Sequence, residues 1–217
     1  TSTIATSDFG AIWTLGKFVI ASYAALIVMY IIHLIIVSGL GLNPVTFVKK
    51  TGEVLMFAFT SRSSAGSLPL NVQTQKNRLG VPDGIANFSA SFGLSIGQNG
   101  CAGIYPAMLA VMVAPAAGVE VNLQFILSVI GVVIISSFGV AGVGGGATFA
   151  SIIVLSTLNL PVALAGVLIS VEPLIDMGRT ALNVNDSMLA GTGTAKLTNN
   201  LDTDTYHSKE YGEITSS

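Results

Sequence analysis

Residues Asn122–Leu160 read NLQFILSVIGVVIISSFGVAGVGGGATFASIIVLSTLNL, a stretch without a charged side chain. Two apolar arms flank a tip of small residues, FGVAGVGGGA (Phe138–Ala147), and each arm is short for a helix that must cross a bilayer. Irregular backbone at membrane depth persists only where protein or water satisfies its polar groups. The stretch therefore predicts a re-entrant hairpin, which enters a membrane and turns back. The alternative is that the glycines merely allow tight helix packing.

A second stretch repeats this pattern earlier in the chain. Residues Val45–Leu79 also have apolar arms, around the tip SRSSAGS (Ser61–Ser67), and a long helix candidate follows each hairpin. Paired interrupted segments in corresponding positions are a sequence sign of a transporter site. The predicted organisation is an N-terminal segment with one transmembrane helix (1–44), hairpin 1 (45–80), a transmembrane helix (84–119), hairpin 2 (122–160), a last transmembrane helix (162–195) and a polar tail (196–217).

The composition supports a membrane protein. Charged residues make up 9% of the 217 residues and hydrophobic residues 51%, whereas roughly 25% of an average soluble chain is charged. Lipid must therefore cover much of the surface, and the helix candidate Phe18–Leu42 is long enough to span a bilayer. A net charge of −2 gives no electrostatic case for nucleic-acid binding. Cys101 is the single cysteine, which excludes a disulfide framework or a cysteine-rich metal site within the chain.

Lysine and arginine residues predict an orientation. Lys49, Lys50, Lys76 and Arg78 flank the base of hairpin 1, whereas Glu120 lies at the base of hairpin 2. By the positive-inside rule, hairpin 1 enters from the cytoplasm and hairpin 2 from outside, so the two repeats are inverted. The tail, which is polar, acidic and without an expected fold, is then cytoplasmic. Because the sequence shows neither an initiator Met nor a signal-peptide pattern, we expect that the chain starts inside a larger protein or was cut from one.

The last helix candidate carries a charged stripe. Glu172, Asp176, Arg179 and Asn183 follow one another at spacings of four, three and four residues, which places them on one helical face with Thr180 alongside. Charges inside a spanning helix are costly and usually line a substrate or ion path. Asp176 can accept from a substrate ammonium and Arg179 can clamp a carboxylate, so the stripe predicts a zwitterionic or amino-acid ligand. The alternative is a buried Asp176–Arg179 pair that only fixes helix packing.

Three other ionisable residues receive no functional role from the sequence. His33 lies in the first helix candidate and is interpreted as a packing or lipid-interface residue rather than a proton relay. Glu53 and Arg62 belong to hairpin 1, where either can pair locally.

Four motifs together carry a family resemblance: SRSSAGSLP (Ser61–Pro69), GLSIGQNGCAG (Gly93–Gly103), GVAGVGGGA (Gly139–Ala147) and DMGRTALNV (Asp176–Val184). They resemble the dicarboxylate/amino acid:cation symporters, the glutamate-transporter-like family. The resemblance implies an all-α multi-pass protein of the bacterial inner (plasma) membrane that forms a homotrimer and uses no cofactor. It also implies that five spanning helices precede this chain, which would hold one scaffold-associated helix and most of the mobile transport domain.

Within the family, the chain is most similar to the bacterial L-cystine symporters. Those proteins carry RSSAGSLPLN, SIGQNGCAGIYPAM and GVAGVGGGATFA nearly as this chain does. Acidic amino-acid members usually have Asn-Met-Asp-Gly-Thr where this chain has GQNGC (Gly97–Cys101).

The resemblance assigns the hairpin tips to the substrate. Ser63 and Ser64 of the first tip are expected to bind the α-carboxylate. Backbone around Val143 and Ala147 of the second tip is expected to cover the substrate as a gate.

The resemblance assigns the remaining substrate contacts to the interior. Asp176 is expected to take the amino group with help from Asn183 and Thr180. Arg179, which holds the side-chain carboxylate in acidic amino-acid members, can hold the far carboxylate of cystine. Cys101 occupies the place of a Thr that lines the distal pocket, and a small apolar filler is the expected role rather than redox exchange with the substrate.

The coupling cation is left open between sodium and a proton. Family sodium sites use an Asn and an Asp where this chain has Gly97 and Asn99, and an Asp where it has Ser187, although Asp186 is adjacent. A third site, built mostly from backbone carbonyls, is expected to persist. The alternative is that Glu172 or Asp176 carries a proton, because burial raises the pKa of a carboxylate. The candidate cation-binding residues are Gly93, Ser95, Gly97, Gln98, Asn99, Ser137, Phe138, Val140, Asn183 and Asp186; the carboxylates considered for a proton are Glu172 and Asp176.

The sequence thus predicts a secondary symporter that imports L-cystine by an elevator-like movement and catalyses no covalent chemistry. One alternative is a symporter for acidic amino acids or dicarboxylates. Alternatives of another class are a channel or pore subunit and a purely structural membrane subunit, against which the charged stripe argues.

Overall fold

The computed structural model of the chain describes residues 9–139 and 145–208, which fold into helices with no strand among them. This confirms the all-α prediction. The helices are α2 (Phe9–Gly39), α3 (Pro44–Ser61), α4 (Leu68–Asn77), α5 (Asp83–Gly93), the π-helix η1 (Asn99–Ile104), α6 (Tyr105–Ala116), α7 (Leu123–Ser137), α8 (Gly146–Thr157), α9 (Val162–Ile169), α10 (Glu172–Leu197) and α11 (Thr203–His207).

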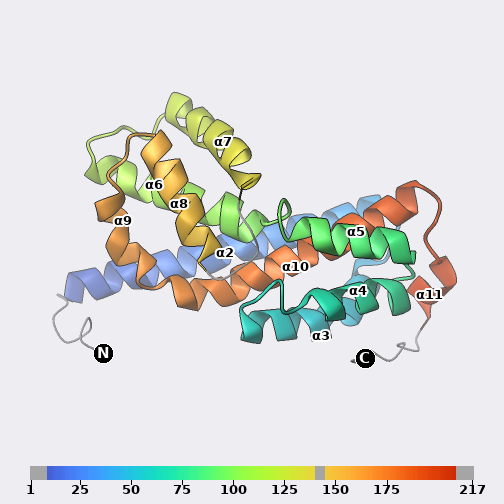
Figure 1. Cartoon of the computed structure of the whole chain (residues 1–217). Coiled ribbons are helices and arrows are strands. Elements are labelled where there is room, and N and C mark those ends of the chain that lie inside the picture. Colours follow the sequence, from blue (N-terminus) through green and yellow to red (C-terminus); the bar gives the residue numbers. More distant parts are fainter. Residues whose placement is uncertain (1–8, 140–144, 209–217) are drawn as a thin grey trace.

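Helix α10 packs against several other elements. It contacts α2, α3, α4, α5 and η1, and α2 runs beside it along much of its length (Figure 1). An apolar core at one end joins α6, α7, α8 and α9 to the first half of α2. A second core, at the other end, packs α3 and α5 against α10 and the last part of α2.

Two pairs of consecutive helices lie within the segments that the sequence predicts as hairpins. Helices α3 and α4 contact each other, as do α7 and α8. Each hairpin begins with an asparagine cap: Asn43 accepts from Val45 N at 2.9 Å, and Asn122 accepts from Phe125 N at 3.0 Å. These side chains satisfy N–H groups that a helix start leaves free. Arg62, with a φ of 55°, ends α3 in the left-handed conformation. Re-entry into a membrane stays a prediction.

The segment expected as one helix over 84–119 is interrupted. Helix α5 ends at Gly93, and the chain turns before η1 begins at Asn99. The side chain of Gln98 donates to Gly93 O at 2.7 Å. A carbonyl at the end of α5 therefore finds a partner without a continued helix.

The segment expected as one helix over 162–195 is likewise two helices. Helix α9 ends at Ile169, four residues before Pro173, and α10 begins at Glu172. Proline lacks an N–H and its ring clashes with the carbonyl four residues earlier, so the helix cannot continue through it. At the start of α10 the same proline is tolerated, because the first N–H groups of a helix have no intrahelical acceptor.

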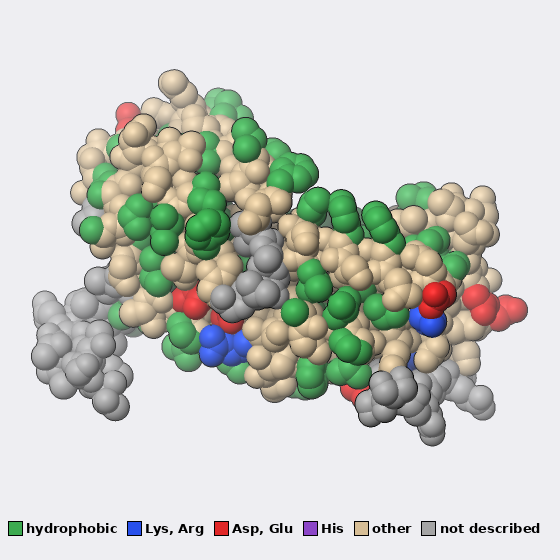
Figure 2. Space-filling view, in the orientation of Figure 1, with side chains coloured by type: hydrophobic (Ala, Val, Ile, Leu, Met, Phe, Trp, Pro, Cys, Tyr) green, Lys and Arg blue, Asp and Glu red, His purple; other side chains and the backbone are tan. Residues whose placement is uncertain are grey.

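Much of the surface is apolar. Large hydrophobic side chains are exposed on α2, α7 and elsewhere, among them Ile20, Ile35 and Ile135. Figure 2 shows hydrophobic side chains spread over the face in view, with charged side chains confined to a few places. Leu15–Gly39 and Asn99–Ala116 are long and apolar enough to cross a membrane, judged by length and composition. An apolar surface of this extent is one that lipid or further protein covers.

Helix α2 is tied directly to α10. Tyr23 donates its hydroxyl hydrogen to Leu174 O at 2.8 Å, and His33 Nε2 lies 2.8 Å from Asp186 Oδ1. Gly178 permits this approach, because a Cβ there would lie 2.8 Å from the Tyr23 ring. The structure therefore differs from the expectation of a scaffold-associated helix, since α2 belongs to the body built on α10.

The sequence predicts a solvated tail without a fold. Up to residue 208, the tail is instead folded and packed against the rest of the chain. Tyr206 of α11 is fully buried, and its hydroxyl donates to Asn43 O at 3.0 Å. The buried ammonium of Lys50 donates to Thr205 O at 2.5 Å and to Arg78 O at 2.8 Å. Helix α11 thus closes the base of hairpin 1.

An aspartate cap holds α11 in shape. Asp202 Oδ1 accepts the N–H groups of Asp204 and Thr205, both at 3.1 Å, and Oδ2 accepts from the Thr205 hydroxyl at 2.6 Å. The Thr205 hydroxyl and N–H hold the pKa of Asp202 below its usual range. A lowered carboxyl pKa means that this stabilisation exists above the unfolded-state pKa and is lost as the pH falls through the folded one.

A pair of glycines tests the docking of this segment. Gly80 and Gly118 have nearly the same left-handed backbone, with φ of 70° and 75°. A Cβ on Gly80 would lie 2.3 Å from Asp202 O, whereas a Cβ on Gly118 would meet nothing within 4 Å. We expect Gly118→Ala to cost about 1–2 kcal/mol of backbone strain. Gly80→Ala should cost more, because it also displaces the segment that leads into α11.

Thermal unfolding of the two purified variants in detergent measures the difference. Equal melting temperatures would show that Asp202 does not lie against Gly80.

Candidate functional site

Four charged side chains meet at the start of α10, and we call them the Arg179 cluster. Arg179 Nη2 donates to Asp176 Oδ1 at 3.0 Å and also pairs with Glu172. Arg62, from the tip of hairpin 1, donates through Nε to Asp176 Oδ2 at 3.1 Å. The cluster therefore holds two guanidinium and two carboxylate groups, whose formal charges cancel.

Arg179 is fully buried but only partly paired. Its Nε and Nη1 have no hydrogen-bond partner among the described residues. The guanidinium carbon lies 4.1 Å from the centre of the Tyr105 ring, a cation–π contact that helps hold the charge in place. A buried donor without a partner is costly, so these two nitrogens are a site where a carboxylate can bind.

Asn183 joins the stripe to the interrupted helix. Its Oδ1 accepts from Gly100 N at 2.7 Å, and its Nδ2 donates to Gln98 Oε1 at 2.9 Å. Its Nδ2 also lies 3.1 Å from Cys101 Sγ. A Cβ on Gly100 would lie 3.0 Å from the backbone of Arg179, so glycine is what lets η1 come this close. Among the predicted substrate residues, the structure thus brings Cys101 and Asn183 together with Arg179.

The tip of hairpin 1 reaches the stripe through a residue to which the sequence gave only a local partner. Arg62 contacts Asp176 across 114 residues of sequence instead of pairing within the hairpin. Ser64 is buried, and Ser63 Oγ accepts from Gly66 N at 2.9 Å within the tip itself. A basic residue at the tip of an apolar hairpin was the available signal, because its charge needs a partner.

The other predicted substrate residues have different positions. Thr180 is buried beside Arg179. Ala147 is buried in α8 and belongs to the same apolar core as Cys101. Val143 lies outside the described residues.

Part of the predicted cation set lines one cavity. This cavity has a volume of about 250 Å³, and its walls come from the turn before η1, from η1, α7 and α10. Gly93 lies outside its wall, where its carbonyl accepts from Gln98. Ser95 and Phe138 are exposed, and Val140 lies outside the described residues. The predicted residues that line the cavity are Gly97, Gln98, Asn99, Ser137 and Asp186.

This chain has Ser187 at a position where the resemblance leads us to expect an aspartate. Ser187 accepts from Asn71 Nδ2 at 2.6 Å and donates to Val184 O at 2.8 Å, so it belongs to a closed hydrogen-bond network. Within the described residues, no three Asp, Glu, His or Cys side chains gather as a metal-binding group. Asp186 is the carboxylate that borders the cavity.

His33 is the residue near this cavity that the sequence interpretation left without a role. It is buried, with 4% of its surface exposed, which contradicts a lipid-interface position and agrees with the packing alternative. Its two ring nitrogens contact Asp186 and Asn185. A lone histidine in an apolar helix gives no sign of its partner, because that partner lies on another helix.

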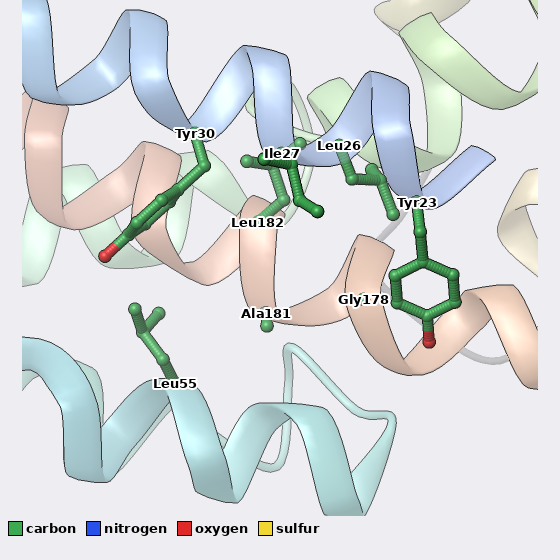
Figure 3. A pocket seen from close by; sticks show the side chains of 8 residues that line it. All are labelled: Tyr23, Leu26, Ile27, Tyr30, Leu55, Gly178, Ala181 and Leu182. Carbon is green, nitrogen blue, oxygen red and sulfur yellow. The ribbon is translucent and has the colours of Figure 1, made fainter. Parts of the chain in front are cut away.

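A separate cavity of about 180 Å³ lies between α2, α3 and α10 (Figure 3). Its walls are apolar side chains and the rings of Tyr23 and Tyr30. A zwitterion would leave its charges without partners there. This cavity is therefore unsuited to an amino acid.

Comparisons with known proteins indicate the family of the chain. Residues 1–197 match the model of the sodium:dicarboxylate symporter family. The L-cystine uptake protein TcyP of Bacillus licheniformis is 70% identical over 210 residues, which cover 96% of this chain and 45% of that protein. The proteins of the same name from Shouchella clausii and Bacillus cereus are 68% and 64% identical, over 95% and 99% of this chain and 44% and 47% of their own lengths.

The chain thus spans about half the length of the curated relatives that it matches. The family description and the names of these relatives describe transporters rather than enzymes. The match over residues 1–197 and these identities show that the chain belongs to the sodium:dicarboxylate symporter family.

Proposed function

We propose that the full-length protein is a secondary symporter that imports L-cystine across the bacterial plasma membrane, driven by a cation gradient. The observation that carries this proposal is the buried guanidinium of Arg179, which lies beside the carboxylate of Asp176 and has two nitrogens without a partner among the described residues. A carboxylate and an ammonium on one ligand match these two groups.

The exposure of Arg62 and Arg179 indicates which of the two arginines a ligand displaces from Asp176. The side chain of Arg62 is 42% exposed and that of Arg179 is 1% exposed. A ligand ammonium can therefore replace Arg62 at Asp176, while Arg179 stays in place and clamps a carboxylate. Both steps keep every buried charge paired, which is the condition for charges to be tolerated in a low-dielectric interior.

Charge balance favours cystine over acidic substrates. The Arg179 cluster has no formal net charge, and cystine, with two ammonium and two carboxylate groups, has none at neutral pH. A dicarboxylate or glutamate would bring an uncompensated negative charge into the site. The names of the TcyP relatives, which describe L-cystine uptake, support the same choice.

The mechanism that we propose is alternating access of the elevator type. The hairpins α3–α4 and α7–α8 act as re-entrant hairpins in an inverted repeat, and three copies of the protein form a homotrimer. Tight docking of α2, α3 and α5 on α10 supports movement of these elements as one body. A channel, the alternative of another class, needs no such body, and saturable counterflow of cystine would exclude a simple pore.

Uptake into vesicles that contain the purified full-length protein tests the substrate. We expect labelled cystine to accumulate, and excess unlabelled cystine to suppress this more strongly than excess glutamate does. Suppression by glutamate at equal or lower concentration would instead support the acidic amino-acid alternative.

Substitutions in the Arg179 cluster test its chemistry. Arg179→Lys keeps the charge but loses the planar pair of donors. We expect cystine affinity to fall by roughly ten- to a hundredfold, about 1.4–2.7 kcal/mol. Asp176→Asn should abolish binding, because the ligand ammonium is left in the site without an anion.

Arg62→Gln is the contrasting variant. It should tighten cystine binding, because the ammonium no longer has to displace a guanidinium from Asp176. Direct binding to folded, purified variants provides all three comparisons. If Asp176→Asn bound cystine as the wild type does, this assignment of the cluster would be wrong.

Cysteine labelling tests the inverted topology. In a background without reactive cysteines, a cysteine near Lys76 should react only from the cytoplasm and one near Glu120 only from outside. Reaction of both positions from the same side would contradict the inverted repeat.

A further inference from the structure

Two carboxylates of α10 share one nitrogen of the buried Arg179. Its Nη2 donates to Asp176 Oδ1 at 3.0 Å and also pairs with Glu172. The side chains of Glu172 and Asp176 are 13% and 12% exposed, so both carboxylates are largely removed from water. The proposed function assigns one ligand ammonium to Asp176 and one ligand carboxylate to Arg179, and it gives Glu172 no contact with the ligand.

Cystine brings a second ammonium group into this site. Each half of cystine is an α-amino acid, so an ammonium at Asp176 leaves another one at the far end of the molecule. That far end also carries the carboxylate that Arg179 clamps. An ammonium that leaves water without meeting an anion is costly. The far ammonium therefore needs a carboxylate close to Arg179.

Glu172 meets this condition. Besides Asp176, it is the carboxylate in the described part of the chain that contacts Arg179. The other carboxylates of residues 9–139 and 145–208 lie elsewhere: near the base of hairpin 1 (Glu53, Asp83), beside His33 (Asp186), before hairpin 2 (Glu120) and at α11 (Asp202, Asp204).

The spacing of Glu172 and Asp176 fits the length of cystine. Both residues lie in α10, four positions apart, which corresponds to about 6 Å along a helix axis. The two α-carbons that a disulfide links are typically about 4.4–6.8 Å apart, and in cystine each of them carries one ammonium group. One turn of α10 can therefore present a carboxylate to each end of the same molecule.

We propose that Glu172 binds the far ammonium of cystine and thereby selects cystine over ligands with a single ammonium group. This inference rests on the proposed function and specifies its ligand further. The far carboxylate binds the two nitrogens of Arg179 that have no partner among the described residues. Each ammonium of the ligand then faces one carboxylate of α10, and the guanidinium between these carboxylates faces a carboxylate of the ligand.

A purely structural role of Glu172 would have a different consequence. Glu172 lies in the first turn of α10, where a carboxylate is favourable beside free N–H groups, and it helps to neutralise the buried Arg179. If these were its only effects, removal of its charge would weaken every ligand that uses Arg179 by the same factor. Contact with the far ammonium affects only ligands that have this ammonium.

Two ligands that differ only in this group provide the test. One is L-cystine. The other is the mixed disulfide of L-cysteine and 3-mercaptopropionate, which keeps the disulfide, both carboxylates and the near ammonium. Binding of each is measured by titration calorimetry on the purified full-length protein in detergent at neutral pH. We expect the wild type to bind cystine roughly 10- to 100-fold more tightly, the range of a hydrogen bond to a charged group.

Substitution of Glu172 should remove this preference. In Glu172→Gln, the affinity for cystine should fall by about the same factor, whereas the affinity for the mixed disulfide should not fall. Glu172→Asp keeps the charge at a shorter reach and should retain part of the preference. Glu53→Gln is the matched control, because Glu53 also pairs with an arginine, Arg78, but away from the cluster. It should bind both ligands as the wild type does. Thermal unfolding without ligand shows whether each variant is folded.

The outcomes separate this role of Glu172 from the transport activity. Equal loss of affinity for both ligands in Glu172→Gln would overturn the proposal in favour of the structural role. A wild type that binds both ligands equally would also overturn it, and this result decides the question even if Glu172→Gln does not fold. Cystine uptake that continues in either case would leave the proposed function intact. A wild type that binds neither ligand would overturn the proposed function, and this inference with it.

Discussion

The buried charge of Arg179 is the constraint on which the rest of the structure depends. A guanidinium without exposed surface is tolerated only if anions and a polarisable neighbour surround it. Glu172 and Asp176 provide the anions and the ring of Tyr105 lies against its face. The break before Pro173 places Glu172 at the start of α10, within one helical face of Arg179. The interruption between α5 and η1 brings η1 against the turn of α10 that carries Arg179. Only a glycine, Gly100, fits at this contact.

Local geometry explains what could be predicted from the sequence. The spacing of Asp176, Arg179 and Asn183 places them on one face in any α-helix, and the structure confirms that Asp176 and Arg179 pair at 3.0 Å. The hairpin arms were predictable for a similar reason, since apolar runs ending at small or polar residues determine where helices start and stop. The break at Pro173 carried a local signal too, because a proline inside a helical pattern ends the helix before it.

Contacts between distant segments explain what could not be predicted. Arg62 and Asp176 are 114 residues apart, and Asn185 and His33 are 152 residues apart, so neither pairing has a periodic signature. The turn after Gly93 depends on the side chain of Gln98, which substitutes for a backbone donor. The docking of α11 depends on Tyr206, whose hydroxyl donates to Asn43 O. In each case the sequence shows a polar or aromatic residue, but only the fold provides its partner.

The docking of α11 at the base of hairpin 1 also has a consequence for the order in which the protein assembles during synthesis. Lys50 and Thr205 are separated by 155 residues, and Asn43 and Tyr206 by 163. During synthesis the base of hairpin 1 therefore emerges from the ribosome long before the segment that covers it. Until then the ammonium of Lys50 lacks one of its two carbonyl acceptors. Final assembly of this end of the molecule is thus a late event, governed by the closure of long-range contacts rather than by helix formation.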